Sequence, residues 1–516
     1  MNRRNFMTGM ARTAALATLA KCLSASSATA KVLLATGIAA DPRRPQFHFL
    51  PAFNWMNDPN APIYFNGRYH IFYQYNPNGA YWGDMHWGHA ISSDMVHWKH
   101  LPMALAPTPG GPDADGCFTG TAVLQDGRAT ILYTGVHAAP ADQATSKDGP
   151  HSLCETQCLA TSDDPELRTW SKLATPVISA PPPGMQVNGF RDPSPWRQGD
   201  WWYLVIGSGI ANQGGAVLLY KSKDLRNWEY VSILAGRNQN GARTFDAFDP
   251  WEVWECPEFF SLGERHVLIY STSGKAFWQS GVLDSARMTF RAEHSGILDY
   301  GSYYAPKTQL DQSGNRILWG WIPETRPLEE FKAAGWAGLM SLPRVLSMGS
   351  DGLLRIAVAK EIEQLRRQEQ RLDLTVGENL CRSQIASMRL EVCSGEILLQ
   401  ARRGSDPFEM ALCELAKDAA PWVTVQYHPL YPGQVSIDAR PLTVAFGDGE
   451  DLEIRMYIDG SVIEVFVNEQ IAITRRFYCS GGNPQNLHLR WQGKTAVIAR
   501  LSLWQISPIS ADRLTT

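Results

Sequence analysis

The sequence carries little excess charge of either sign. Its 47 basic and 51 acidic residues leave a formal net charge of -4, and no long basic stripe runs along the chain. Proteins that bind nucleic acids or anionic membranes concentrate positive charge on one face or segment. We therefore expect neither nucleic acid nor a membrane as partner, and a neutral, polar small molecule or oligosaccharide suits this balance better.

Several motifs are missing as well. The nine cysteines are scattered without a Cys-x-x-Cys pair, which argues against a zinc ribbon and leaves disulfide pairing open. The Gly-x-Ser-x-Gly turn of many serine hydrolases is absent. On a strand, His86 and His89 would point to opposite faces, which disfavours a shared metal. The sequence thus predicts no metal site and no cofactor.

The first 30 residues are typical of an export signal. Arg3 and Arg4 form a twin-arginine pattern, a mildly apolar stretch follows at 14–20, and residues 28–30 offer a small-x-small cleavage site. Beyond this segment no run approaches the roughly 20 apolar residues of a membrane span. We expect residues 1–30 to be a twin-arginine-type signal peptide and the mature protein to be periplasmic or secreted, free of the membrane. An uncleaved tail is the alternative.

A repeat organises the first part of the chain. A turn ending in glycine, followed by a short run of β-branched and aromatic residues, occurs at 67–73, 127–133, 199–205, 263–270 and 314–319. Such runs read as strands, and a unit of four strands takes about 40–60 residues in a propeller. We predict a five-bladed β-propeller over residues 31–350. A large irregular sandwich with similar turns is the alternative.

The pattern changes after residue 350. Helix formers dominate 359–368, which predicts a connecting helix within a linker at 351–373. Alternating strands then return, with a turn at Asp459-Gly460 between the runs 452–458 and 461–467. The sequence therefore predicts an all-β protein of two domains, the second a β-sandwich over 374–516.

Three carboxylates stand in unusual local sequences: Asp58 before a proline and among aromatics, Asp192 between Arg191 and a proline, and Glu255 in a Trp-Glu-Cys-Pro run. An arginine beside Asp192 favours its ionised form. Taken singly, an Asp-Pro step is more often a plain turn than a catalyst. All three fall at similar stages of separate repeats, however, and a propeller would bring them to one central funnel.

These residues carry a family resemblance. Asn57-Asp58-Pro59, Arg191-Asp192-Pro193 and Glu255-Cys256-Pro257, with their neighbours, resemble the signature blocks of glycoside hydrolase family 32, which includes invertases, fructan hydrolases and fructosyltransferases. Further blocks follow in the same order at 73–77, 82–84, 87–90, 118–120, 299–301, 320–321, 335–338 and 458–466. The resemblance covers nearly the whole mature chain. It implies a five-bladed propeller followed by a sandwich, most similar to the plant-like members.

The resemblance also implies roles. Asp58 would be the nucleophile and Glu255 the general acid/base of a retaining glycosidase, and Asp192 would stabilise the oxocarbenium-like charge. The substrate would be a terminal β-D-fructofuranosyl unit of inulin, levan or sucrose. Residues expected to bind it are Asn57, Gln74, Trp82, Phe118, Thr119, Arg191, Asp299 and Trp321.

Some positions depart from the family pattern. Ala61 and Glu258 are mild departures, whereas Ser302 stands where plant invertases carry a lysine associated with accepting sucrose. This makes fructan hydrolysis the firmer prediction. A fructosyltransferase, which differs only in the acceptor, remains an alternative, and a non-catalytic fructan-binding protein is disfavoured because all three carboxylates are present. The preferred linkage and the oligomeric state stay open.

Overall fold

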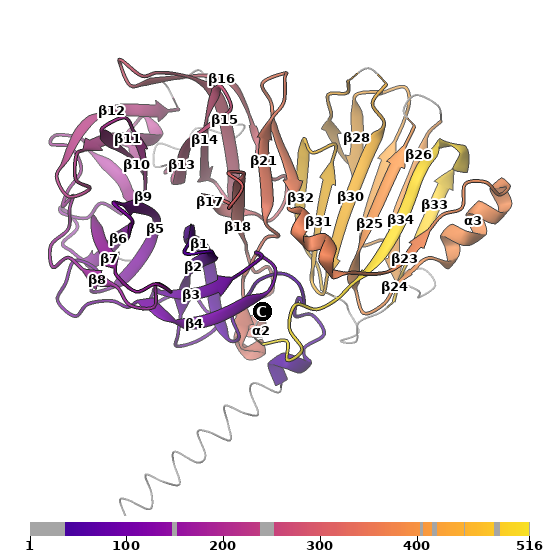
Figure 1. The fold of residues 1–516 in the computed structure, drawn as a ribbon, viewed down its shortest axis with the longest axis horizontal. Helices are drawn as coiled ribbons and strands as arrows, with labels where there is room; N and C mark the ends of the chain where they lie inside the picture. The colour runs from indigo at the N-terminus through magenta and orange to yellow at the C-terminus, as the bar shows by residue number, and fades with distance from the viewer. Residues whose placement is uncertain are drawn as a thin grey trace, which may run out of the picture.

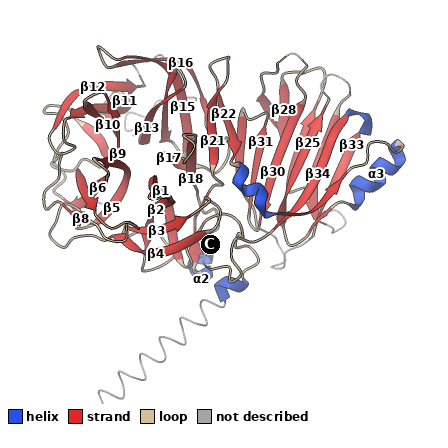
Figure 2. Ribbon diagram, viewed as in Figure 1, coloured by secondary structure: helices blue, strands red, loops and turns tan. Residues whose placement is uncertain are grey.

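The computed structural model describes residues 37–146, 152–237, 252–402, 406–414, 420–447, 449–478 and 486–514. The predicted signal peptide at 1–30 lies outside these residues. Strands dominate and helices are few and short (Figure 2). In the described part of the chain, no helix combines the length and apolar character needed to cross a membrane.

Five small sheets come first, within the described residues. The first holds β1 (Asn54–Phe65), β2 (Arg68–Asn76), β3 (His86–Ser92), β4 (Trp98–Leu105) and β19 (Trp336–Ala337). The second holds β5 (Gly116–Gln125), β6 (Arg128–Ala138), β7 (Leu153–Ser162) and β8 (Ser171–Lys172), and the third β9 (Val187–Gln198), β10 (Trp201–Ile210), β11 (Gly214–Ser222) and β12 (Trp228–Gly236). The fourth holds β13 (Glu255–Leu262), β14 (Arg265–Thr272), β15 (Lys275–Asp284) and β16 (Thr289–Ile297). The fifth holds β17 (Tyr304–Leu310), β18 (Arg316–Ile322), β20 (Leu339–Met340), β21 (Arg344–Met348) and β22 (Leu354–Val358), with helix α2 (Leu328–Ala334) between β18 and β19.

The first strands of these sheets surround a common axis. Each of β1, β5, β9 and β13 contacts the first strand of the next sheet, and β17 contacts β1 (Figure 1). This is the arrangement of a β-propeller, with the sheets radiating from a central channel. The prediction of five blades assigns one blade to each of these sheets.

The repeated glycines occupy equivalent turns. Gly67, Gly127, Gly199, Gly263 and Gly314 all have positive φ, between 59° and 82°. Each lies in the hairpin that joins the first strand of a sheet to the second. A left-handed backbone costs glycine nothing, so the repeat seen in the sequence is a repeat of hairpin turns.

The boundary between the domains differs from the prediction. The fifth sheet continues past residue 350, because β21 pairs with β22 as far as Val358. The predicted connecting helix is present only as a short 3-10 helix, η1 (Lys360–Leu365), which leads directly into β23 (Arg366–Arg371). Helix propensity is overridden because Arg366 joins the second domain, where its guanidinium makes 2.6 Å bonds to both carboxylate oxygens of Glu396.

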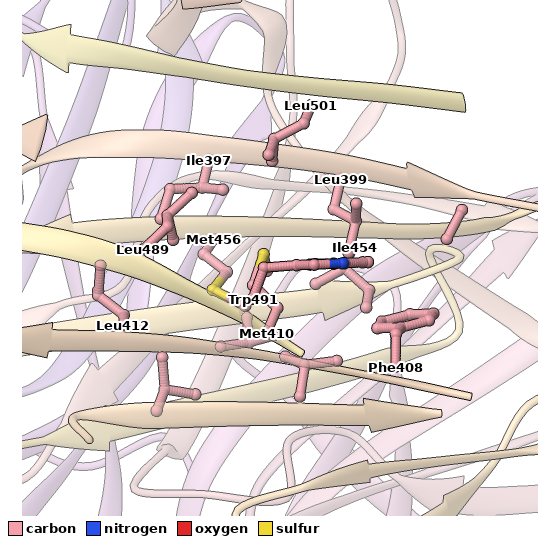
Figure 3. Packing of buried hydrophobic residues seen from close by; sticks show 14 of the residues in the cluster. Ile397, Leu399, Phe408, Met410, Leu412, Ile454, Met456, Leu489, Trp491 and Leu501 are labelled. Carbon is pink, nitrogen blue, oxygen red and sulfur yellow. The ribbon is translucent and has the colours of Figure 1, made fainter. Parts of the chain in front are cut away.

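The second domain is a sandwich of two six-stranded sheets. One runs in the order β23, β34 (Ile498–Ile506), β25 (Ser394–Ala401), β30 (Leu452–Asp459), β31 (Val462–Val467) and β32 (Ile471–Arg476). The other runs β24 (Arg389–Leu390), β33 (Leu487–Gly493), β26 (Phe408–Glu414), β27 (Val423–Tyr427), β28 (Gln434–Ile437) and β29 (Arg440–Thr443). Helices α3 (Glu378–Ser387) and η2 (Thr495–Val497) complete the domain. Figure 3 shows its apolar core, in which side chains from β25 and β26 meet.

A buried polar cluster joins the two domains. Arg344 of β21 bonds to Asp299 at 2.9 Å and to Glu464 of β31 at 2.6 Å. His48 lies between Asp459 and Glu464, with ring nitrogens 2.8 and 2.9 Å from their oxygens. The two carboxylates raise the pKa of His48 against the effect of burial. All five side chains are fully buried, so the charges stabilise one another only while the domains stay together.

Candidate active site

The inner strands are bulged where they approach the axis. The pairing register shifts between Met56 and Pro59 in β1, between Cys117 and Gly120 in β5, between Arg191 and Ser194 in β9, between Glu255 and Glu258 in β13, and between Tyr304 and Lys307 in β17. In four of these bulges a proline removes a donor from the ladder. The residues before three of the prolines, Asp192, Cys256 and Ala305, have φ of 66°, 50° and 51°. A β-bulge changes the direction in which the neighbouring side chains point. Here the bulges turn those side chains into the channel at a common depth.

The bulges surround one cavity of about 390 Å³. It brings together all three predicted catalytic carboxylates, Asp58, Asp192 and Glu255. Its other walls come from Asn57, Gln74, Trp82, Phe118, Ser146, Leu153, Arg191, Cys256, Tyr304 and Trp321. Among the residues expected to bind substrate, Asn57, Gln74, Trp82, Phe118, Arg191 and Trp321 therefore line the cavity, and Thr119 stands just behind it.

Asp58 is held by neutral donors. Thr119 Oγ1 donates to one carboxylate oxygen at 2.6 Å, and Asn57 Nδ2 donates to the other at 3.0 Å. Gln74 in turn bonds to both donors, at 2.7 and 3.0 Å. Burial raises the pKa of Asp58, these hydrogen bonds lower it, and the charge of Glu255 raises it further, so that the net shift is upward. Among the described residues Asp58 forms no ion pair, so neutral hydrogen bonds alone orient its carboxylate there.

Glu255 has charged and phenolic partners instead. Arg191 bonds to its Oε1 through Nη2 at 3.0 Å and Nε at 3.2 Å, and the Tyr304 hydroxyl donates to its Oε2. The arginine is itself anchored by Glu155, 2.7 Å from Nη1. The side chain of Glu255 is 28% exposed, so substrate and water can reach it. An accessible carboxyl with oriented partners can deliver and accept a proton.

Asp192 lies between the two. Its Oδ2 accepts a hydrogen bond from the Cys256 backbone N–H at 2.8 Å, and its own N–H donates to Thr134 Oγ1 at 2.8 Å. Burial raises the pKa of Asp192 to about 7, and Arg191 lowers it only in part. Arg191 acts in the direction expected from the sequence, because its charge favours the ionised form of Asp192, but burial outweighs it and the guanidinium bonds instead to Glu155 and Glu255.

Asp299 is not part of the cavity. It is fully buried and accepts hydrogen bonds from Arg344 and from the backbone and hydroxyl of Thr474, at 2.9, 2.9 and 2.6 Å. Ser302 N–H donates to the Thr474 carbonyl at 2.7 Å. The segment runs along β32 of the sandwich, so the prediction that Asp299 binds substrate is wrong. Ser302 likewise does not line the cavity. The serine at this position therefore gives no evidence for or against sucrose as a substrate.

Tyr304, Cys256 and Glu155 were missed as site residues. A signal for the tyrosine exists in the sequence: Arg191, Glu255 and Tyr304 each precede a proline by two positions. The three occupy equivalent places in the bulges of β9, β13 and β17. Glu155 has no comparable signal, since it lies mid-strand in β7 and reaches the site only through Arg191.

Known proteins resemble this chain over both of its domains. Residues 48–356 match the N-terminal domain of glycosyl hydrolases family 32, and residues 416–505 match the C-terminal domain of the same family. The sucrose-6-phosphate hydrolase of Escherichia coli is 36% identical over 480 residues, covering 90% of this chain and 94% of its own. A structure of fructan 1-exohydrolase IIa from Cichorium intybus with 1-kestose superposes with a TM-score of 0.71 at 26% identity, covering 90% of this chain and 98% of that one.

A third relative is the β-fructofuranosidase of Bombyx mori in complex with sucrose, with a TM-score of 0.72 and 27% identity over 93% of this chain and 97% of that one. The matches span both domains. The chain belongs to glycoside hydrolase family 32 and is a glycoside hydrolase.

Proposed function

We propose that the enzyme removes terminal β-D-fructofuranosyl units from fructans and sucrose and releases fructose. The observation that carries this proposal is the convergence of Asp58, Asp192 and Glu255 in one cavity of about 390 Å³, a size typical of pockets for small ligands. The complexes of related proteins with 1-kestose and sucrose support a fructoside as the substrate.

The partners of each carboxyl assign its role. Asp58, held by Thr119 and Asn57, attacks the anomeric carbon of the fructosyl unit and forms an ester, while Glu255 gives its proton to the departing oxygen. In the second step Glu255 takes a proton from water, the resulting hydroxide attacks the ester, and Asp58 leaves. Two displacements at one carbon retain its configuration.

Asp192 acts without forming a bond. Buried beside both reacting groups, it is placed to accept hydrogen bonds from sugar hydroxyls and to stabilise positive charge that develops on the ring. Burial raises the pKa of Asp192 to about 7, and sugar hydroxyls that donate to its carboxylate would lower that pKa and favour the ionised form.

The cavity favours an unphosphorylated sugar. Among the described residues that line it, the only cationic side chain is Arg191, which already contacts Glu155 and Glu255. A sugar phosphate in this pocket would meet acidic groups and no uncommitted cation within that part of the wall. We therefore propose sucrose and fructans as substrates ahead of sucrose 6-phosphate.

Sugar release tests the proposal. The purified enzyme is expected to liberate fructose from sucrose, inulin or levan, whereas Asp58→Asn is expected to lose nearly all activity. Glu255→Ala should be slow, and azide should partly restore its turnover on substrates with good leaving groups, because they need no protonation. Asp163→Asn is the matched control, because this carboxylate lies in an exposed ion pair with Arg128 and does not line the cavity. Full activity in Glu255→Ala would refute the assignment.

We also propose that residues 1–30 direct export. Arg3 and Arg4, the apolar stretch and the small residues that follow support this. Exchanging both arginines for lysine in the full chain should hold the enzyme in the cytoplasm, as measured by activity in fractionated cells. Unchanged export of that variant would exclude the twin-arginine route.

A further inference from the structure

The sandwich domain carries a second concave surface, remote in sequence from the catalytic cavity. It encloses about 560 Å³ on the sheet that contains β33, β26, β27 and β28. None of the residues that line it also lines the catalytic cavity. Its volume lies in the range of sites that hold small ligands or a few sugar rings.

Strand register places a row of polar side chains across this groove. Gln492 pairs with Glu409, Glu409 with Gln426, and Gln426 with Ser436, so one residue of each strand stands opposite the next. The residues on either side of each in its strand point to the other face, where Val425 and Trp491 are buried. Three strand spacings make the row about 14 Å long.

The row has the chemistry that sugar hydroxyls require. Gln426 Nε2 donates to Glu409 Oε2 at 2.8 Å, and the Gln492 amide, the Gln426 amide oxygen and the Ser436 hydroxyl belong to side chains that line the groove. Side-chain amides and carboxylates offer paired donors and acceptors to vicinal hydroxyls. The single negative charge of Glu409 is balanced by Arg490 at 3.9 Å, so the surface suits a neutral ligand.

An aromatic ring borders the row. Tyr431 is 62% exposed in the turn between β27 and β28 and lies 6.1 Å from the His428 ring, centroid to centroid. His428 organises this turn: its carbonyl accepts from Tyr431 N–H at 2.9 Å and its Nδ1 from Leu430 N–H at 3.2 Å. These bonds hold the backbone of the turn, and the Tyr431 ring lies exposed as an apolar platform beside polar groups.

We propose that this groove is a second, non-catalytic binding site for a neutral oligosaccharide, namely a fructan chain, and this identity rests on the proposed function. The polymer would lie across the row of Gln492, Glu409, Gln426 and Ser436 and stack one sugar face on Tyr431. Holding a long substrate on the sandwich raises its effective concentration at the catalytic cavity of the same molecule. A short substrate such as sucrose gains nothing from it.

Binding of levan and inulin to Asp58→Asn protein, followed by gel retardation or calorimetry, tests the site without cleavage. Exchanging Gln426 and Tyr431 for alanine in that background should weaken polymer binding by about tenfold or more. Leu380→Ala on α3, whose side chain is 60% exposed, is the matched control and should bind as the parent does. Tyr431→Phe, which keeps the ring, should retain most of the binding.

The same exchanges in the active enzyme should leave kcat/KM for sucrose unchanged and lower kcat/KM for the polymers. Equal binding of polymer with and without the groove residues would overturn the proposal, as would equal retardation by dextran and levan. Failure of the proposed function is distinct: the active enzyme would then release no fructose from sucrose, whatever the state of the groove.

Discussion

Tyr304→Phe is expected to slow the enzyme without unfolding it. The exchange removes one hydroxyl, which donates to Glu255 Oε2, and leaves the ring in place. A hydrogen bond to a charged group contributes about 1.5 to 3 kcal/mol. At 1.36 kcal/mol per tenfold, this corresponds to roughly 10- to 150-fold in kcat/KM. Because Arg191 still holds the other oxygen at 3.0 Å, the loss should lie toward the lower end.

The leaving group distinguishes positioning of the acid from general damage. Initial rates would be compared for sucrose and for an aryl β-fructofuranoside whose phenolate departs without protonation. The loss in Tyr304→Phe should be large for sucrose and small for the aryl substrate, since only the first needs the proton of Glu255. Tyr64→Phe, which removes a hydroxyl that contacts Gln312 at 3.2 Å, is the control. Equal losses on both substrates would refute a role for Tyr304 in positioning the acid.

Two further exchanges test the charges. Asp192→Asn should abolish turnover yet raise the stability of the fold at pH 8. Burial raises the pKa of Asp192 to about 7, so between about pH 4 and pH 7 the folded state binds a proton that the unfolded chain has released. The wild type therefore loses stability as the pH rises through this window, and the Asn variant does not. The gain should be a few kcal/mol at pH 8 and vanish near pH 4 in denaturant titrations, and a gain independent of pH would contradict this account. Arg344→Met should cost about 3 to 5 kcal/mol by leaving Asp299 and Glu464 buried without their cation. Arg128→Met, at an exposed pair, should cost less than about 1 kcal/mol, and a similar loss in both variants would mean that the buried cluster stabilises the protein no more than a surface ion pair does.

The sequence predicted the centre of the site better than its surroundings. Asp58, Asp192 and Glu255 could be found because each stands one or two residues before a proline in a repeating unit, and a bulge at that point is a local property. Tyr304 occupies an equivalent position before a proline, but a tyrosine with no acidic residue next to it gives no sequence signal of catalysis.

Errors arose where contacts between distant segments decide the structure. Asp299 stands in a family-like block, yet its partners Arg344 and Thr474 come from two other parts of the chain. The run at 359–368 has helix-forming composition, but pairing of Arg366 with Ile506 and its ion pair with Glu396 place the last three residues in a strand. Local preference could not predict either contact, because the first depends on how the domains pack and the second on pairing between strands far apart in the sequence.

The bulged inner strands also determine where the chain can change length. Since side chains alternate along a strand, inserting or deleting one residue between a bulge and its hairpin would turn Asp58, Asp192 or Glu255 away from the cavity. The hairpins at Gly67, Gly199 and Gly263 lie at the other end of the same strands, where a Cβ added to any of these glycines would meet nothing within 4 Å. Natural variation and engineered loops should therefore accumulate at those tips, while each inner strand keeps an unchanged count of residues.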